Sequence, residues 1–159
     1  EQIVLGDNIR IDDFCILSGN IKLGSYIHIS AYTCLIGGVK GIILQDFVTV
    51  SSRCAVYAVS DDFSGEQLNN SMIPTAYRSV IEGRVILEDY VSVGTGSTIL
   101  PGVKLEEGAA VGAMSFVKHT LEGWKIYAGA PCRYVKDRNQ NMKQLRAVLQ
   151  NSGEYEESR

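Results

Sequence analysis

The amino-acid sequence predicts an all-β fold: a parallel β-helix of about five coils, with a long loop near residues 62–84 and a C-terminal α-helix. Three observations predict this fold: a six-residue repeat that begins at Leu5, a break in that repeat after Asp61, and an amphipathic stretch beyond Arg138. A repeat with a fixed period is the sequence signature of a solenoid. The length of 159 residues suits one domain with a sizeable core.

The repeat comprises fifteen hexads, nine before the break and six after it. Its first position is Leu, Ile or Val in every hexad, and its fifth position is usually small or β-branched. An amphipathic helix needs apolar spacings of three and four, and a single strand alternates every second residue, so neither explains this period. Each hexad is therefore expected to form a short strand and a turn, with its first side chain pointing inward.

Three hexads make one coil of a triangular prism in this interpretation. The expected coils span residues 5–22, 23–40, 44–61, 87–104 and 105–122. Residues 41–43 lie between two hexads and belong to neither, and we expect them to form a corner bulge. The spacing alone does not determine the handedness of the coil.

Composition and charge disfavour several classes of protein. The net charge of −3 and the lack of any basic block disfavour nucleic-acid binding. The apolar runs are too short to span a membrane, and no signal peptide is recognisable. The four cysteines have no C-x-x-C spacing, which predicts neither a zinc site nor a disulfide framework. We expect a soluble cytoplasmic protein with reduced thiols and no permanently bound cofactor or metal. The chain begins at Glu1 rather than Met, which leaves a preceding segment open.

Beyond the repeat, residues 139–151 are expected to form a helix, and residues 152–159 a polar tail. The helix carries one apolar stripe that should pack against the prism or a neighbouring subunit, formed by Met142, Leu145, Val148 and Leu149. Residues 1–138 then form the β-helix domain, from which the loop of residues 62–84 extends. A long loop on a rigid solenoid is more often functional than accidental, although a tolerated surface insertion stays possible.

Several motifs resemble one known family. The hexad array, the Leu-Pro-Gly-Val turn at 100–103, the V-G-A-x-S at 111–115 and the closing YAGAPCRYVKDR at 127–138 are similar to those of hexapeptide-repeat acyltransferases. Within them, the chain is most similar to the galactoside and maltose O-acetyltransferases and their nucleotide-sugar N-acyltransferase relatives. The resemblance spans residues 5–138. It implies a left-handed β-helix, a homotrimer with active sites between subunits, and acetyl-CoA or another acyl-CoA as co-substrate.

The chain departs from that family at the start of the loop. There the resemblance implies a histidine that acts as general base, but the hexad register brings Asp61 to that position. His28 and His119 lie in distant hexads, and we interpret both as surface residues. Asp61 or Asp62 must therefore perform any base chemistry, unless none is needed. The alternative is that Asp61 and Asp62 have no catalytic role and form a solvated corner followed by an Asx-type turn.

This departure favours an amine as acceptor. A hydroxyl is a poor nucleophile that usually needs a positioned base, and an aspartate with an ordinary pKa of about 3.9 is a weak one. A sugar amine can be bound and oriented by a carboxylate, so we favour N-acylation of a nucleotide-linked deoxyamino sugar for cell-surface polysaccharide. Repulsion between two adjacent carboxylates, or burial, raises a pKa and would restore a general base. Sugar O-acetylation is the alternative, and a non-catalytic trimeric binding module is the second.

The resemblance also implies further site residues. We assign to the acceptor pocket Ser60, in the last hexad before the loop, and the loop residues Phe63, Tyr77 and Arg78. Thr95 and Ala113 lie one coil apart, where the family's backbone amides hold the thioester and the pantetheine arm, although small corner residues also serve a fold alone. The family binds the CoA phosphates with cationic side chains. The residues at the matching positions of this chain are Lys118, Arg133 and Lys136. Trp124 could pack against the adenine of CoA or cover the open end of the prism, and we expect the second.

Overall fold

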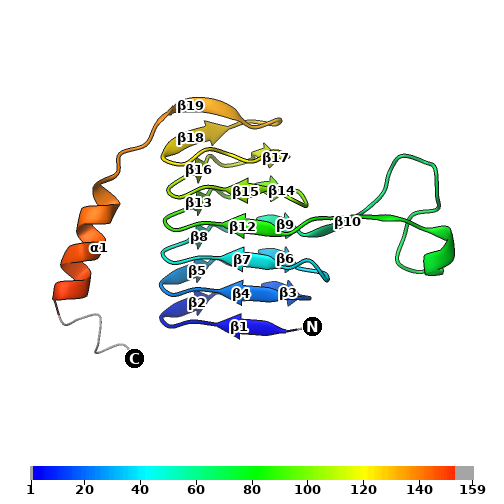
Figure 1. The fold of residues 1–159 in the computed structure, drawn as a ribbon, viewed down its shortest axis with the longest axis horizontal. Helices are drawn as coiled ribbons and strands as arrows, with labels where there is room; N and C mark the ends of the chain where they lie inside the picture. The colour runs from blue at the N-terminus through cyan, green and yellow to red at the C-terminus, as the bar shows by residue number, and fades with distance from the viewer. Residues whose placement is uncertain (1, 153–159) are drawn as a thin grey trace.

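The chain forms a three-sided parallel β-helix from which an arm and a C-terminal helix extend (Figure 1). This computed structural model describes residues 2–152. In Figure 1 the coil climbs from the N-terminus at the bottom, while the strands facing the viewer point to the left, which is the path of a left-handed helix. The predicted fold class is confirmed.

Each side of the prism is one sheet. Face 1 contains β1 (Ile3–Leu5), β4 (Ile21–Leu23), β7 (Ile42–Leu44), β12 (Val85–Leu87) and β15 (Lys104–Leu105). Face 2 contains β2 (Ile9–Ile11), β5 (Ile27–Ile29), β8 (Thr49–Val50), β13 (Ser92–Val93), β16 (Ala110–Val111), β18 (Lys125–Ala128) and β19 (Arg133–Asp137). Face 3 contains β3 (Ile16–Ser18), β6 (Cys34–Ile36), β9 (Ala55–Tyr57), β14 (Thr98–Ile99) and β17 (Phe116–Val117).

The hexad register explains the core. First-position side chains such as Leu23, Ile29 and Leu35 are at most 1% exposed, as expected. Fifth-position side chains are buried too, for example Ile27 and Val48, because each strand spans the junction of two hexads and both of its ends point inward. Two apolar columns per face, rather than one, therefore fill the prism.

Two details of the predicted coils are wrong. The excess residues lie in the corner turn of residues 37–41, closed by a hydrogen bond from Gly41 N to Gly37 O (2.8 Å), while Ile42 and Ile43 already belong to β7. The expected five coils are also too few. Leu121 forms a parallel bridge with Leu105, and β18 pairs in parallel with β16, so the solenoid continues before β19 turns back antiparallel to β18.

The corner between faces 1 and 2 carries a ladder of aromatic rings. Ring centroids are 5.0 Å apart for Tyr26 and Phe47, 5.6 Å for Phe47 and Tyr90, and 5.7 Å for Tyr90 and Trp124. All four residues have a positive φ, a conformation that costs a non-glycine residue roughly 1–2 kcal/mol. Stacking offsets part of that cost. Trp124 thus belongs to this corner, and the expectation that it covers the open end is wrong.

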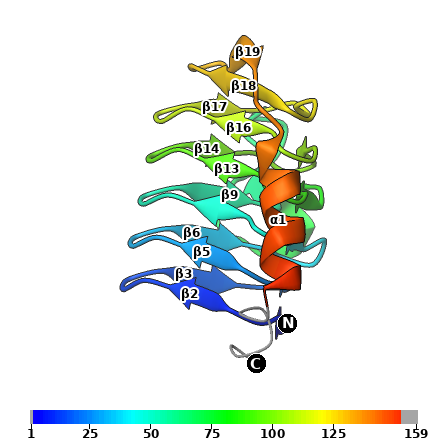
Figure 2. The ribbon, with the colours of Figure 1, turned by 90° about the vertical axis from the view of Figure 1, so that its left-hand side faces the viewer.

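Helix α1 (Asn141–Asn151) lies along this aromatic corner (Figure 2). Met142, Leu145 and Leu149 face Phe47 and Tyr90 across a small apolar gap, so the stripe does pack against the prism. Val148 is 65% exposed and does not contribute to that contact, contrary to the prediction. With 11 residues the helix is far too short for a bilayer, and no helix among the described residues could cross a membrane.

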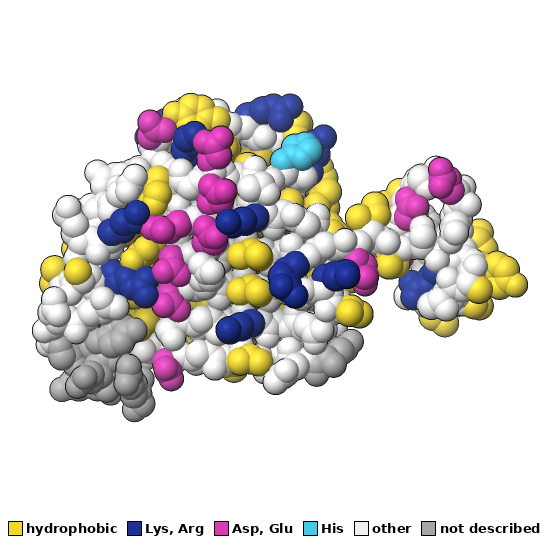
Figure 3. All heavy atoms as spheres, viewed as in Figure 1, with side chains coloured by type: hydrophobic (Ala, Val, Ile, Leu, Met, Phe, Trp, Pro, Cys, Tyr) yellow, Lys and Arg dark blue, Asp and Glu magenta, His cyan; other side chains and the backbone are white. Residues whose placement is uncertain are grey.

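The arm leaves the corner between faces 3 and 1. It begins with an antiparallel pair of strands, β10 (Val59–Asp61) and β11 (Val80–Glu82), in which Asp61 lies opposite Val80. Only residues 62–79 are irregular, apart from a short 3₁₀ helix at Thr75–Tyr77, so the loop expected over residues 62–84 is shorter than its sequence pattern suggested. Figure 3 shows the arm as a separate lobe beside the solenoid, with apolar side chains on it.

Candidate functional site

A groove of about 530 Å³ lies where the arm meets face 3. One wall comes from the solenoid and consists of Ile36, Tyr57 and Leu100. The other comes from the arm and consists of Val59, Ser60, Asp61, Phe63, Arg78 and Val80. The charged groups lie on the arm and the apolar wall lies on the solenoid, so the groove has a polar side and an apolar side.

Asp61 is the charged acceptor of this groove. It ends β10, and its side chain is 34% exposed. Arg78 Nη1 lies 3.9 Å from Asp61 Oδ1, a distance at which the charges attract without a direct hydrogen bond. The Nε atom of Arg78 is buried and has no hydrogen-bond partner among residues 2–152. The groove thus offers a ligand one carboxylate and the partly exposed guanidinium of Arg78, whose Nε atom is itself buried.

Asp62 has a different role from its neighbour. Its carboxylate accepts hydrogen bonds from Ser64 N (2.8 Å), Ser64 Oγ (3.0 Å) and Ser79 Oγ (2.9 Å). These bonds, that from the Ser64 backbone first, lower the pKa of Asp62. Repulsion between adjacent carboxylates would instead raise the pKa of Asp62. Asp62 ties together the two ends of the irregular segment and so positions the arm.

The other predicted acceptor residues divide by position. Ser60, Phe63 and Arg78 line the groove. Tyr77 lies in the 3₁₀ helix, is 66% exposed and does not line it. Among the three predicted residues that line the groove, Phe63 forms its outer rim, because Phe63 is 78% exposed.

Three groove residues were absent from the sequence-based assignment: Ile36, Tyr57 and Leu100. All three are second positions of their hexads, one coil apart, so they form a column on the outside of face 3. The register that predicts the inward core therefore also contains this outward column. The missing information was that the arm leaves the solenoid beside it.

Thr95 and Ala113 lie at the opposite edge of face 3, on the corner with face 2. Both side chains are exposed, and Met114 N donates to Thr95 O (2.8 Å), so the two turns stack. A Cβ on Gly94 would lie 2.5 Å from Ala113 N, which explains the glycine at this close approach. The predicted acceptor and CoA residues therefore occupy two edges of one face and do not meet within a single chain.

The predicted CoA-phosphate ligands gather at the C-terminal end of the solenoid. Lys118 follows β17, and Arg133 and Lys136 belong to β19. All three are exposed, and none forms an ion pair with a carboxylate within the described part of the chain. Their charges are thus available to an anionic ligand.

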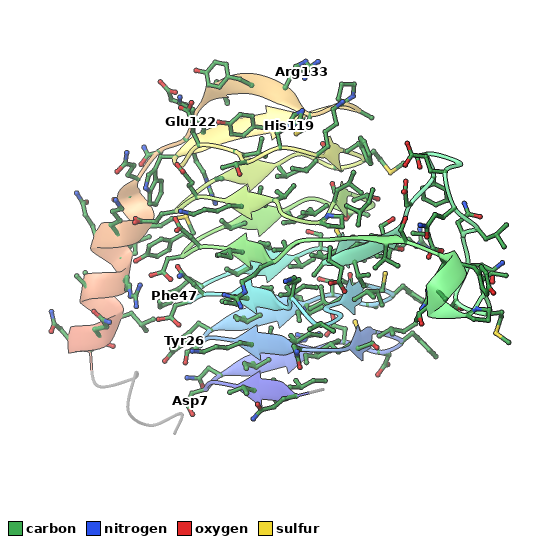
Figure 4. All side chains as sticks on the ribbon, turned by 45° about the vertical axis from the view of Figure 1, so that its right-hand side comes forward. Asp7, Tyr26, Phe47, His119, Glu122 and Arg133 are labelled. Carbon is green, nitrogen blue, oxygen red and sulfur yellow. The ribbon has the colours of Figure 1, made fainter. Side chains whose placement is uncertain are left out.

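Both histidines lie away from the groove. His28 Nε2 is 3.0 Å from Asp12 Oδ2 on face 2, and hydrogen bonds from His28 and then Arg10 lower the pKa of Asp12. His119 is exposed at the same end of the solenoid as Arg133 (Figure 4). Neither imidazole lines the groove, in agreement with their interpretation as surface residues.

Comparison with known proteins gave relatives over nearly the whole chain, although no family model matches it. The dTDP-4-amino-4,6-dideoxy-D-glucose acyltransferase of Escherichia coli is 36% identical over 155 residues, which cover 96% of this chain and 80% of that protein. A putative lipopolysaccharide biosynthesis O-acetyl transferase of Escherichia coli K12 is 25% identical over 147 residues, covering 90% and 72%.

Solved structures give a similar result. AntD, an N-acyltransferase from Bacillus cereus, matches with a TM-score of 0.93 and 49% identity over 94% of this chain and 81% of its own, in complex with dTDP-4-amino-4,6-dideoxyglucose and CoA. Variants of one aspartate and one serine are among its structures. A maltose O-acetyltransferase from Clostridium difficile matches with a TM-score of 0.71 and 20% identity, over 86% and 70%, which shows a common fold.

Proposed function

Since the chain belongs to the hexapeptide-repeat β-helix family of acyl-CoA-dependent nucleotide-sugar acyltransferases, we propose that it acylates the amine of a dTDP-linked 4-amino-4,6-dideoxy sugar. The observation that carries this choice is Asp61, a carboxylate in the groove with no histidine beside it. A carboxylate can bind and orient an ammonium group, whereas a hydroxyl acceptor needs a base nearer neutrality. An aspartate and a serine are also the residue types altered in the AntD complexes.

Asp61 and Arg78 divide the binding of the acceptor in this proposal. The Asp61 carboxylate accepts hydrogen bonds from the sugar amine and fixes its direction toward the thioester. Arg78 donates from the exposed part of its guanidinium to an oxygen of the sugar or its diphosphate. Ser60 and Phe63 bound the same space, and Asp62 keeps the arm in place.

The transfer is a direct substitution at the thioester in a ternary complex. The neutral amine attacks the carbonyl carbon, a C–N bond forms, and the C–S bond breaks. The nitrogen loses one proton to solvent or to the departing CoA thiolate, which leaves an amide and free CoA. Backbone N–H groups at the corner of Thr95 and Ala113 hold the carbonyl oxygen as it gains negative charge. Cations of the C-terminal end, namely Lys118, Arg133 and Lys136, bind the CoA phosphates.

The position of these residues supports a site that is completed by a second copy of the chain. Asp61 and the pair Thr95 and Ala113 lie on opposite edges of face 3, which favours a site in which a neighbouring prism supplies one of them. The exposed apolar side chains of the arm, among them Phe63 (78%) and Met72 (87%), favour contact with that neighbour. We therefore propose a homotrimer with three sites between subunits, located in the cytoplasm, which supplies acyl-CoA.

An assay of CoA thiol release tests this function. The purified protein is mixed with acetyl-CoA or 3-hydroxybutyryl-CoA and with a panel of dTDP-linked amino and neutral sugars. We expect thiol release and a new amide only with amino sugars, and a loss of roughly 100-fold in kcat/KM for Asp61→Asn. Asp7→Asn, on an exposed aspartate of the first coil, is the matched control. Acylation of neutral sugars alone would favour O-acetyl transfer instead.

A further inference from the structure

The solenoid side of the groove is an apolar column on three successive coils. Ile36 and Tyr57 are direct partners in the pairing of β6 with β9, and Leu100 follows Ile99, the partner of Val56 next to Tyr57. The three side chains thus stand in a row, opposite Asp61 and Arg78 on the arm. Such a row is not required for the fold, because the outward positions of face 2 include the polar residues Thr49 and Ser92.

The column offers little to a hydroxyl group. Its polar atom is the Tyr57 hydroxyl, which interacts with the Cys34 thiol on the neighbouring strand. Burial, and then Cys34, raise the pKa of Tyr57, so the phenol stays neutral. A substrate hydroxyl placed against Ile36 or Leu100 would lose its hydrogen bonds to water without replacement.

We propose that Ile36, Tyr57 and Leu100 bind an alkyl group of a substrate and thereby set its specificity. This inference rests on the proposed function, because an acceptor amine at Asp61 brings the rest of the sugar against this column. A 6-deoxy sugar carries a methyl group where other hexoses carry a hydroxymethyl group, and a methyl group gains free energy from apolar contact. The column therefore selects the deoxy sugar. The hydrocarbon end of the acyl chain could present the same alkyl chemistry, so the test separates the two sources.

The expected selectivity is moderate. An apolar site rejects an analogue that adds one hydroxyl by about 10- to 100-fold in kcat/KM, because the hydroxyl can still turn toward solvent at the rim. The wild-type protein should therefore prefer the 6-deoxy over the 6-hydroxy dTDP-amino sugar by that factor, and a polar replacement in the column should reduce the preference by about tenfold.

Two substrate series measured with the same variants test the column. In the first, acetyl-CoA is fixed and the sugar carries methyl or hydroxymethyl at C6. In the second, the sugar is fixed and the acyl group is acetyl or butyryl. Ile36→Thr and Leu100→Thr change the column at two coils. The matched control is Ile43→Thr, the outward middle residue of β7 on face 1, outside the groove.

A fall in the methyl preference for both column variants, with the control unchanged, supports a sugar-binding column. A change in the butyryl-to-acetyl ratio alone assigns the alkyl group to the acyl chain. Ratios that stay within twofold of wild type in both series, for variants that melt within a few degrees of the control, overturn the inference. Failure of the proposed function gives a different result: the wild-type protein itself would acylate no dTDP-amino sugar.

Discussion

Arg78 and Asp61 face each other across the foot of the arm, with Nη1 and Oδ1 3.9 Å apart, and the Nε atom of the same guanidinium is buried without a partner. The two charges are too close to admit a substrate group between them, but both residues line the groove in which a substrate would lie. The pair therefore lends itself to direct mutational tests.

Replacing Arg78 by lysine should raise the KM for the nucleotide sugar about tenfold with a small change in kcat. Lysine keeps the charge but loses the Nε donor and the planar fork. Steady-state kinetics at saturating acyl-CoA measure the effect, and Arg10→Lys on the exposed first coil is the control. An unchanged KM would remove Arg78 from the acceptor site.

Order of the arm should depend on pH through Asp62. Its folded-state pKa is lowered below the ordinary value of about 3.9, so the folded arm binds the proton less readily than the unfolded arm. Its contribution to arm order is fully present above about pH 4 and is lost as the pH falls through the folded pKa.

Hydrogen exchange of peptides from residues 62–79, followed by mass spectrometry between pH 6 and pH 2.5 and corrected for intrinsic rates, measures this dependence. We expect protection to fall at the acid end in the wild type, and to be low at every pH in Asp62→Asn. Ser79→Ala should give an intermediate profile. The prediction fails if the wild type and Asp62→Asn follow the same curve.

Arg146 should contribute measurably to the stability of the docked helix. It forms ion pairs with Asp46 (2.9 Å) and Asp89 (2.7 Å) and lies over the rings of Phe47 and Tyr90, with its side chain 23% exposed. Arg146→Met would leave two carboxylates close together without their cation, and we expect a loss of about 1–3 kcal/mol in the free energy of unfolding.

Chemical denaturation measures that loss, and trypsin cleavage at Arg138 and Lys143 reports whether the helix has left the corner. Arg146→Lys should lose less, because it keeps the charge. The exposed neighbour Gln144→Met serves as control for an added apolar side chain on the helix.

Gly108 and Trp124 should be energetically coupled. Gly108 has a φ of +70°, and a Cβ there would lie 2.4 Å from an atom of the Trp124 ring. Gly108→Ala should therefore cost the strain of the left-handed conformation, about 1–2 kcal/mol, plus the displacement of the ring. In a Trp124→Ala background the same change should cost only the strain. A double-mutant cycle by urea denaturation measures the difference, and a coupling of zero contradicts the contact.

The hexad register predicted most of the fold, since one period determines both which side chains point inward and which outward positions align. It placed Leu23, Ile29 and Leu35 in the core, and it contains the column of Ile36, Tyr57 and Leu100. It also aligns Asp46 with Asp89, both third positions of hexads in adjacent coils.

The contacts that the register could not predict are those made by parts without a repeat. Nothing in the periodicity indicates that Arg146 reaches Asp46 and Asp89, or that Ser79 returns to Asp62. Likewise, Val80–Glu82 is too short and too irregular in pattern to be recognised as a strand, because its order depends on pairing with Val59–Asp61. Such contacts depend on which distant segments meet in the folded chain, and the repeat carries no information about that.

Val85 pairs with Ile42 in the same register that Ile42 keeps with Ile21, so the stacking of coils passes the arm without a shift. The arm is therefore an insertion between two coils, and its two ends are fixed where it leaves face 3 and where it rejoins face 1. The register of the coils on either side therefore does not depend on the length or sequence of the arm. New acceptor preferences can thus arise in this architecture by replacing one surface segment, with no need to redesign the solenoid core.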